Sequence, residues 1–203
     1  MDELIQGMLD SGILHTPRIV DAFRAIDRAD FVPDTMRTYA YQDIPLPLGN
    51  GQTISQPSTV AFMLELLQPE TQNRILDIGS GSGWTTALLG YLTGSEGYVL
   101  GLERIPELVT LGCNNLATQQ MPWLYIERAG VELGAPERSP FHRILVSAAS
   151  RTFPIELVSQ LTEHGILVIP VRHALWRAER FEHRPIISTY EGYTFVPLIT
   201  DAS

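Results

Sequence analysis

The chain has 203 residues, of which 44% are hydrophobic and 18% are charged, and its formal net charge is −9 with a pI near 4.9. This length suits one sizeable core and is short for two α/β domains. The acidic balance disfavours a DNA or RNA substrate, because nucleic-acid binders normally need a basic face to neutralise phosphates. No apolar run approaches the length needed to span a bilayer, so we expect no membrane partner.

The first residues also bear on where the protein works. The start, MDELI, lacks a basic region and a long apolar stretch, which predicts no secretory signal. A single cysteine, Cys113, excludes an internal disulfide and a multi-cysteine metal site, and we expect a cytoplasmic protein. We expect no metal, because no H-E-x-x-H or comparable ligand spacing links the five histidines, His15, His142, His164, His173 and His183.

Two short helices are expected near the N-terminus, because apolar residues recur at helical spacing over residues 4–14 and 18–26. Thr16 is a candidate N-cap for the second helix, and Pro17 suits its first helical position. The segment 31–51 contains three prolines and two glycines, which predicts an irregular connection. A third helix is expected to begin at Pro57 and to end near residue 67.

Strands and helices then alternate along the chain. Short apolar runs predict strands at 74–78, 98–103, 123–127, 143–147 and 166–171. Helical periodicity predicts helices at 84–92, 106–117 and 154–161. Residues 186–190 and 193–198 are predicted to form a closing antiparallel pair.

This order predicts an α/β fold with three layers: a doubly wound, mostly parallel, Rossmann-like sheet with an N-terminal helical extension and C-terminal antiparallel strands. We expect a single domain, with a helical and irregular extension over 1–52 and the cofactor-binding core over 53–203. In such sheets ligands bind at the carboxyl ends of the strands.

A glycine-rich turn joins the first core strand to its helix. Its glycines, Gly79, Gly81 and Gly83, fall at every second residue, whereas a dinucleotide fingerprint reads G-x-G-x-x-G and would place its third glycine at position 84. Position 84 is Trp. Asp77, two residues before the first glycine, is expected to reach across the turn toward a cationic ligand. This pattern is typical of S-adenosylmethionine-dependent methyltransferases.

The second core strand ends in an acid, Glu103, about 20 residues beyond the turn, where a carboxylate meets ribose hydroxyls in a βαβ unit. Both ligand families use such an acid, so it supports an adenosine ligand without choosing between them. The alternative is a tight strand-to-helix turn without a ligand.

The segment Gly51-Gln-Thr-Ile-Ser-Gln-Pro57 resembles the active-site signature of protein-L-isoaspartate O-methyltransferases. Further matches are spread in the expected order over 30–33, 41–47, 77–83, 134–141, 144–149 and 195–198. The resemblance implies methyl transfer from S-adenosylmethionine to the carboxylate of L-isoaspartyl residues in damaged proteins, which is protein repair. It implies an isoaspartyl protein or peptide as partner, and we expect a monomer.

By position, Ser55 matches the family's active-site serine, although a helix N-cap before Pro57 would explain Ser55 alone. The cofactor contacts implied by the resemblance are Thr53, Ile54, Ser55, Asp77, Gly79, Ser80, Gly81, Ser82, Gly83, Glu103, Arg104, Ala129 and Gly130. An isoaspartyl carboxylate, with a reference pKa around 4, is already ionised near neutral pH and needs no general base.

Three positions depart from the family pattern. Ala129 stands where an acid usually lies by the adenine, Ser58 replaces a larger side chain and is expected to alter the floor of the acceptor pocket, and Arg172 follows a strand where glycine is usual. We interpret the basic stretch from Arg172 to Arg184 as a solvated loop or strand edge rather than a substrate site. The alternatives are a same-fold methyltransferase with another peptide or small carboxylate acceptor, and a non-catalytic binding protein.

Overall fold

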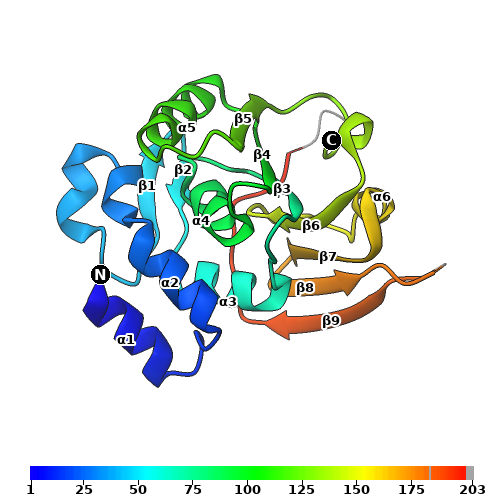
Figure 1. Cartoon of the computed structure of the whole chain (residues 1–203), viewed down its shortest axis with the longest axis horizontal. Helices are drawn as coiled ribbons and strands as arrows, with labels where there is room; N and C mark the ends of the chain where they lie inside the picture. The colour runs from blue at the N-terminus through cyan, green and yellow to red at the C-terminus, as the bar shows by residue number, and fades with distance from the viewer. Residues whose placement is uncertain (183, 200–203) are drawn as a thin grey trace.

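A seven-stranded sheet forms the centre of the computed structural model, which describes residues 1–182 and 184–199 (Figure 1). The strand order is β5-β4-β3-β6-β7-β8-β9. The strands are β3 (Arg74–Ile78), β4 (Tyr98–Glu103), β5 (Leu124–Arg128), β6 (Phe141–Val146), β7 (Leu161–Val171), β8 (Ala174–Glu179) and β9 (Ile186–Glu191). The pairs from β5 to β7 are parallel, and β8 and β9 are antiparallel additions. The predicted Rossmann-like fold class is confirmed.

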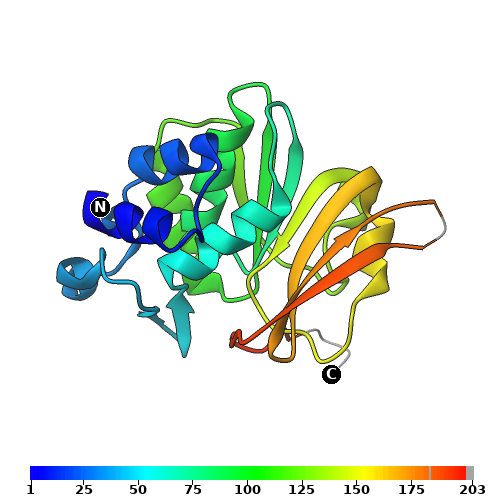
Figure 2. The same ribbon diagram turned by 90° about the horizontal axis from the view of Figure 1, so that it is seen from below.

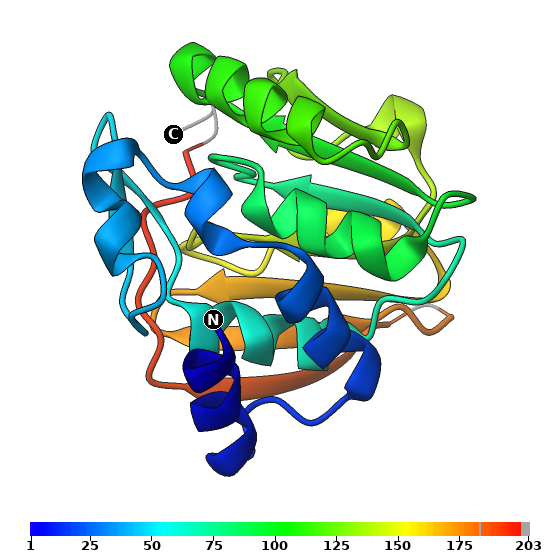
Figure 3. The ribbon, with the colours of Figure 1, turned by 60° about the vertical axis from the view of Figure 1, so that its left-hand side comes forward.

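Helices cover both faces of this sheet. They are α1 (Asp2–Asp10), α2 (Pro17–Ala25), α3 (Pro57–Leu67), α4 (Trp84–Thr93), α5 (Pro106–Thr118) and α6 (Ile155–Ser159), with 3-10 turns at Arg28–Phe31, Asp34–Tyr39 and Pro136–Arg138. Figure 3 shows α3, α4 and α5 side by side across one face, with α1 and α2 outside them. Figure 2 shows α6 on the opposite side of the sheet from α1 and α2.

Two separate apolar cores follow from the alternation of side chains along the strands. Ile75 and Val99 belong to the cluster on the side of α1 to α5, whereas their neighbours Leu76 and Leu100 belong to the cluster that contains Leu157 of α6. The sheet is therefore buried on both faces, as the near-continuous apolar runs of its parallel strands predict.

The N-terminal extension packs into the first of these cores. Thr16 occupies the N-cap position of α2, but its hydroxyl donates to Glu65 Oε2 at 2.6 Å instead of capping the helix. Glu65, on α3, is 7% exposed and also accepts the backbone N–H groups of His15 and Thr16. Ile5 and Phe23 share a buried cluster with Leu88 of α4. We propose that residues 1–182 and 184–199 form one domain.

The helix predicted at 57–67 and the strands predicted at 74–78 and 98–103 are confirmed with the same bounds. Segment 31–51 is not wholly irregular, because β1 (Leu46–Gly49) pairs with β2 (Gln52–Ile54) as a small hairpin. The helix predicted at 154–161 ends at Ser159, since Leu161 already begins β7. β7 starts earlier than predicted because a bulge, with His164 at a φ of 59°, carries a polar stretch into the strand.

The predicted closing pair is wrong. Residues 186–191 form β9, but its partner is β8, and 193–198 is not a strand. The N–H groups of Gly192 and Tyr193 both donate to His173 O in the β7–β8 turn. After β9 the chain therefore continues past this turn and does not reverse to form a hairpin. Residues 174–179 of the basic stretch form β8, which lies between β7 and β9 in the sheet. This part of the stretch is therefore neither a solvated loop nor a strand edge.

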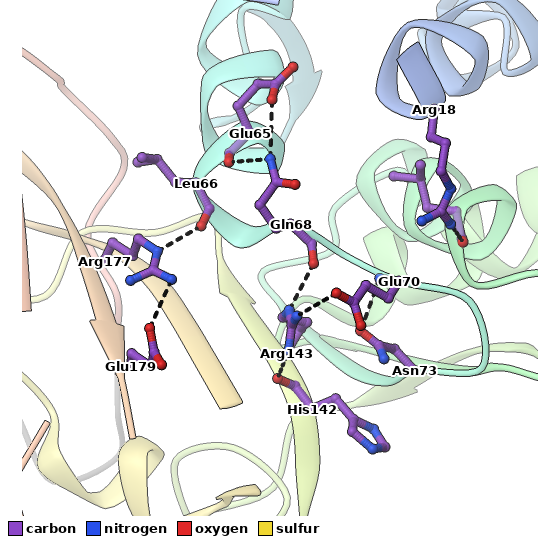
Figure 4. A network of polar contacts seen from close by, with 11 residues as sticks. Arg18, Glu65, Leu66, Gln68, Glu70, Asn73, His142, Arg143, Arg177 and Glu179 are labelled. Atoms are coloured by element: carbon purple, nitrogen blue, oxygen red, sulfur yellow. Dashed lines mark hydrogen bonds and ion pairs between the residues drawn. The ribbon is translucent and has the colours of Figure 1, made fainter. Parts of the chain in front are cut away.

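Arginines from this sheet hold the C-terminal end of α3 (Figure 4). Arg143 Nε donates to Gln68 O at 3.0 Å, and Arg177 Nε donates to Leu66 O at 3.1 Å. The last carbonyls of a helix lack intrahelical donors and carry partial negative charge, so both contacts are favourable. Arg177, expected in solvent, is half-buried and caps a helix.

The turn between β7 and β8 explains one departure from the family pattern and gives a prediction. Arg172 has a φ of 56°, a left-handed conformation that glycine adopts without steric cost. We expect Arg172→Gly to raise the free energy of unfolding by about 1 kcal/mol, measured by urea unfolding. His173→Gly in the same turn is the control, since His173 is not among the described residues with positive φ. Equal effects of the two changes would contradict this interpretation.

Candidate active site

A cavity of about 240 Å³ lies at the carboxyl ends of the parallel strands. It is found beside β3, where the strand order turns from β3-β4-β5 to β6-β7, the position at which open α/β sheets bind ligands. Its wall includes the end of the hairpin, the glycine turn, the end of β4, the loop after β5, the end of β6 and the segment 196–199.

Most of the predicted site residues share this cavity. Those that line it are Thr53, Ile54, Ser55, Gly79, Ser80, Gly81, Ser82, Glu103, Arg104, Ala129 and Gly130. Two predicted residues, Asp77 and Gly83, are not among its lining residues. Segments separated by up to about 80 residues of sequence therefore meet at one point.

The glycine turn has the backbone that its sequence predicts. Gly79, Gly81 and Gly83 have φ values of 79°, 54° and 89°, all left-handed. A Cβ at Gly83 would lie 3.1 Å from Ile126 Cδ1 and 3.4 Å from Gly112 O, so this glycine also permits close packing of the turn against α5 and β5. Gly83 thus supports the turn without lining the cavity.

Glu103 braces the turn from the neighbouring strand. Its carboxylate is 6% exposed and accepts Gly81 N–H at 3.1 Å through Oε2 and Ile105 N–H at 2.9 Å through Oε1. A carboxylate has about four acceptor sites, so Glu103 keeps capacity for a ligand in the cavity that it lines.

Asp77 acts from beneath the turn. It is fully buried, and its Oδ2 accepts the hydroxyls of Thr85 and Thr86, each at 2.7 Å. Burial raises the pKa of Asp77 from 3.8 to about 6; the two threonine hydroxyls oppose this, and the charge of Glu103 adds to it. We expected Asp77 to reach toward a ligand, but its carboxylate instead binds the hydroxyl of Thr85, which lines the cavity.

Another part of the wall is the segment between β2 and α3, where the sequence predicts the acceptor side. Ile54 is buried, Ser55 is half-buried, and both line the cavity with Gln52. Ser58 does not line it, which corrects the expectation for the pocket floor. The Ser58 backbone N–H instead donates to Asp43 Oδ1 at 2.8 Å, because Ser58 lies within the first turn of α3.

Sequence reasoning missed several lining residues. They come from the loop after β5, the end of β6 and the C-terminal segment: Arg128, Val131, Glu132, Leu133, Gly134, Ser147, Ala148, Val196, Pro197, Leu198 and Ile199. The family-like stretches at 134–141, 144–149 and 195–198 were a signal for part of this set. Ala129 lines the cavity where the family acid is usual, and its N–H donates to Glu103 O.

Buried polar atoms without protein partners gather at the turn. Ser80 Oγ, Ser82 Oγ, Trp84 Nε1 and Asp77 Oδ1 all belong to this group, and the first three residues line the cavity. Buried polar atoms are nearly always hydrogen-bonded, so this lining fits a ligand with its own polar groups, such as S-adenosylmethionine.

Among residues 1–182 and 184–199 no group of three or more His, Cys, Asp or Glu side chains is placed to hold a metal ion, and His183 lies outside them. No helix in that part of the chain has the length and hydropathy to cross a membrane.

Comparison with known proteins agrees with this site. The family profile of protein-L-isoaspartate(D-aspartate) O-methyltransferase matches residues 1–203. A protein-L-isoaspartate O-methyltransferase of Methanopyrus kandleri is 38% identical, over 98% of this chain and 90% of that protein. One from Ignicoccus hospitalis is 35% identical, over 98% of this chain and 97% of that protein.

A solved structure assigned to the same family from Plasmodium falciparum, in complex with S-adenosyl-L-homocysteine, has a TM-score of 0.87 at 24% identity and covers 98% of both chains. It shows the fold. Fold and site together define a Rossmann-like, S-adenosylmethionine-dependent methyltransferase. The chain belongs to the protein-L-isoaspartate O-methyltransferase family.

The raised pKa of Asp77 predicts a pH-dependent stability. A carboxyl whose pKa rises from 3.8 to about 6 on folding stabilises the fold most below pH 3.8, and this contribution is lost as the pH rises through 6. Between about pH 4 and pH 7 the free energy of unfolding of Asp77→Asn should therefore rise by about 2 kcal/mol relative to that of the unmodified protein, measured by urea unfolding.

Asp34→Asn is the control, because the Asp34 side chain is 96% exposed. It should show a nearly constant difference over the same pH range. If the free energy of unfolding of Asp77→Asn also differed from that of the unmodified protein by the same amount at every pH, folding would not raise the pKa of Asp77. The effect of burial on Asp77 would then be excluded.

Proposed function

We propose that this protein transfers a methyl group from S-adenosylmethionine to the carboxylate of L-isoaspartyl residues in damaged proteins. The observation that supports this most directly is the cavity that the Ser55 segment lines together with the glycine turn and Glu103. Donor-side and acceptor-side motifs that are far apart in the sequence meet there.

The cofactor side consists of the turn, the end of β4 and the loop after β5. When bound, S-adenosylmethionine supplies a methyl group activated by a positively charged sulfonium. We assign its contacts to Gly79, Ser80, Gly81, Ser82, Glu103, Arg104, Ala129 and Gly130, with Thr53 and Ile54 beside the acceptor. Asp77 and Gly83 hold this wall in shape from behind.

The acceptor chemistry needs orientation rather than a base. An isoaspartyl carboxylate is ionised near neutral pH, so it is already a nucleophile. Aligning its oxygen with the methyl carbon and excluding water then account for the rate. We propose that the Ser55 hydroxyl donates a hydrogen bond to this carboxylate, a role that requires neither a shifted pKa nor a covalent intermediate.

The remaining proposals concern the partner, the oligomeric state and the cellular location. The partner is an isoaspartyl protein or peptide, and the net charge of −9 supports a protein that binds no nucleic acid. We propose a monomer without membrane attachment that works in the cytoplasm, where a lone exposed cysteine such as Cys113 stays reduced.

The proposed function predicts selectivity between two peptides of identical composition. The protein should methylate an isoaspartyl peptide and leave the matching aspartyl peptide at background, measured as S-adenosylhomocysteine released. Calorimetric titration with S-adenosylmethionine should show binding. Binding without methylation of either peptide would favour another acceptor, and no binding would favour a non-catalytic protein.

Ser55→Ala should lower kcat for the isoaspartyl peptide by about 10- to 100-fold, because a hydrogen bond to a charged group is lost. Its Kd for S-adenosylmethionine should stay within about threefold, since the hydroxyl serves the acceptor. Ser58→Ala is a matched control three residues away, outside the cavity. Unchanged kcat in Ser55→Ala would remove this hydroxyl from the mechanism.

A further inference from the structure

A buried arginine stands behind the acceptor segment. Arg28 is fully buried, and its Nη1 donates to Ala40 O at 2.9 Å and to Gln42 O at 3.3 Å. Its Nη2 donates to Ile44 O and to Ser55 O, both at 3.0 Å. One guanidinium therefore joins four carbonyls of the segment that leads to the active-site serine.

The same guanidinium contacts the cofactor side. Its Cζ lies 5.2 Å from the ring centroid of Trp84, within the range of a cation–π interaction. Trp84 is the first residue of α4 and lines the cavity. Phe23 packs edge-on against this ring, with centroids 5.7 Å apart, and so fixes its orientation.

This position is costly for a charged group. Arg28 forms no ion pair among the residues that the structure describes. Burial lowers the pKa of Arg28 to about 10, and the charge of Asp43 opposes this only partly. Packing alone would be served at lower cost by an apolar side chain of similar volume. Its contacts with carbonyls of an irregular segment, which need donors when they are buried, account for a guanidinium here.

We propose that Arg28 is a positioning residue for methyl transfer. By holding the Ser55 carbonyl on one side and the Trp84 ring on the other, it sets the Ser55 hydroxyl at a fixed place relative to the donor wall. A small displacement of an orienting group costs rate even when the ligand still binds. Only the expected change in kcat rests on the proposed function; the expected change in amide hydrogen exchange does not.

The test compares three variants. Arg28→Met removes the donors at similar volume, and Arg28→Lys keeps the charge with fewer directed donors. Arg18→Met is the matched control, because Arg18 Nη2 donates to a carbonyl of α4, Leu92 O, and Arg18 does not line the cavity. All are assayed well below their unfolding temperatures, so that lost stability by itself does not change the rate.

Two readouts are expected to move together. Arg28→Met should raise amide hydrogen exchange over residues 40–56 about tenfold or more and lower kcat for the isoaspartyl peptide about 30-fold, with the Kd for S-adenosylmethionine within about threefold. For Arg28→Lys, both the amide hydrogen exchange over residues 40–56 and kcat should lie between the values of Arg28→Met and those of the unmodified protein. Arg18→Met should match the unmodified protein.

Unchanged exchange over 40–56 in both Arg28 variants would overturn the proposal, as would raised exchange with unchanged kcat. If Arg28→Met does not fold, the same two measurements on Arg28→Lys decide. If the unmodified protein fails to methylate the peptide, the proposed function fails, while exchange over 40–56 still decides whether Arg28 fixes the Ser55 segment.

Discussion

Two buried carboxylates hold the glycine turn after β3, and the rest of the site depends on this hold. Glu103 accepts the N–H of Gly81 within the turn, and Asp77 accepts the hydroxyls of Thr85 and Thr86 just beyond it. Left-handed glycines have few steric restraints of their own, so the acids fix a segment that is otherwise free to vary. The start of α4, and with it the Trp84 ring, takes its place from this turn.

The charges of the site suit a cationic donor and an anionic acceptor in different ways. Asp77 and Glu103 lie close enough for the charge of Glu103 to raise the pKa of Asp77. Two adjacent acids favour a cation near the turn. The overall charge of −9 gives an anionic acceptor no long-range attraction, so local groups must hold it. We propose Ser55 as such a group, and the buried guanidinium of Arg28 donates to its carbonyl.

The sequence predicts the parallel core well because its signals are local: apolar runs, a glycine turn and Pro57 at a helix start. β8 escaped prediction because its charged residues, Arg177 and Glu179, favoured a solvated loop or strand edge, and because the preceding turn uses Arg172 instead of glycine. The inward direction of Asp77 and the position of Ser58 outside the cavity depend on tertiary packing. The role of Arg28 has no local signature either, since its acceptors lie 12 to 27 residues away.

The C-terminal antiparallel strands connect to the acceptor side through α3, which follows Ser55 directly. Arg177 of β8 holds the far end of this helix at Leu66 O. Phe62 of α3 packs edge-on against Tyr190 and stacks on Tyr193, with centroids 5.3 and 5.6 Å away. The chain then passes to the cavity wall, where Ala149 N–H donates to Val196 O at 2.7 Å. Because Arg172 lies at a turn outside the cavity, its departure from the family pattern leaves this path intact.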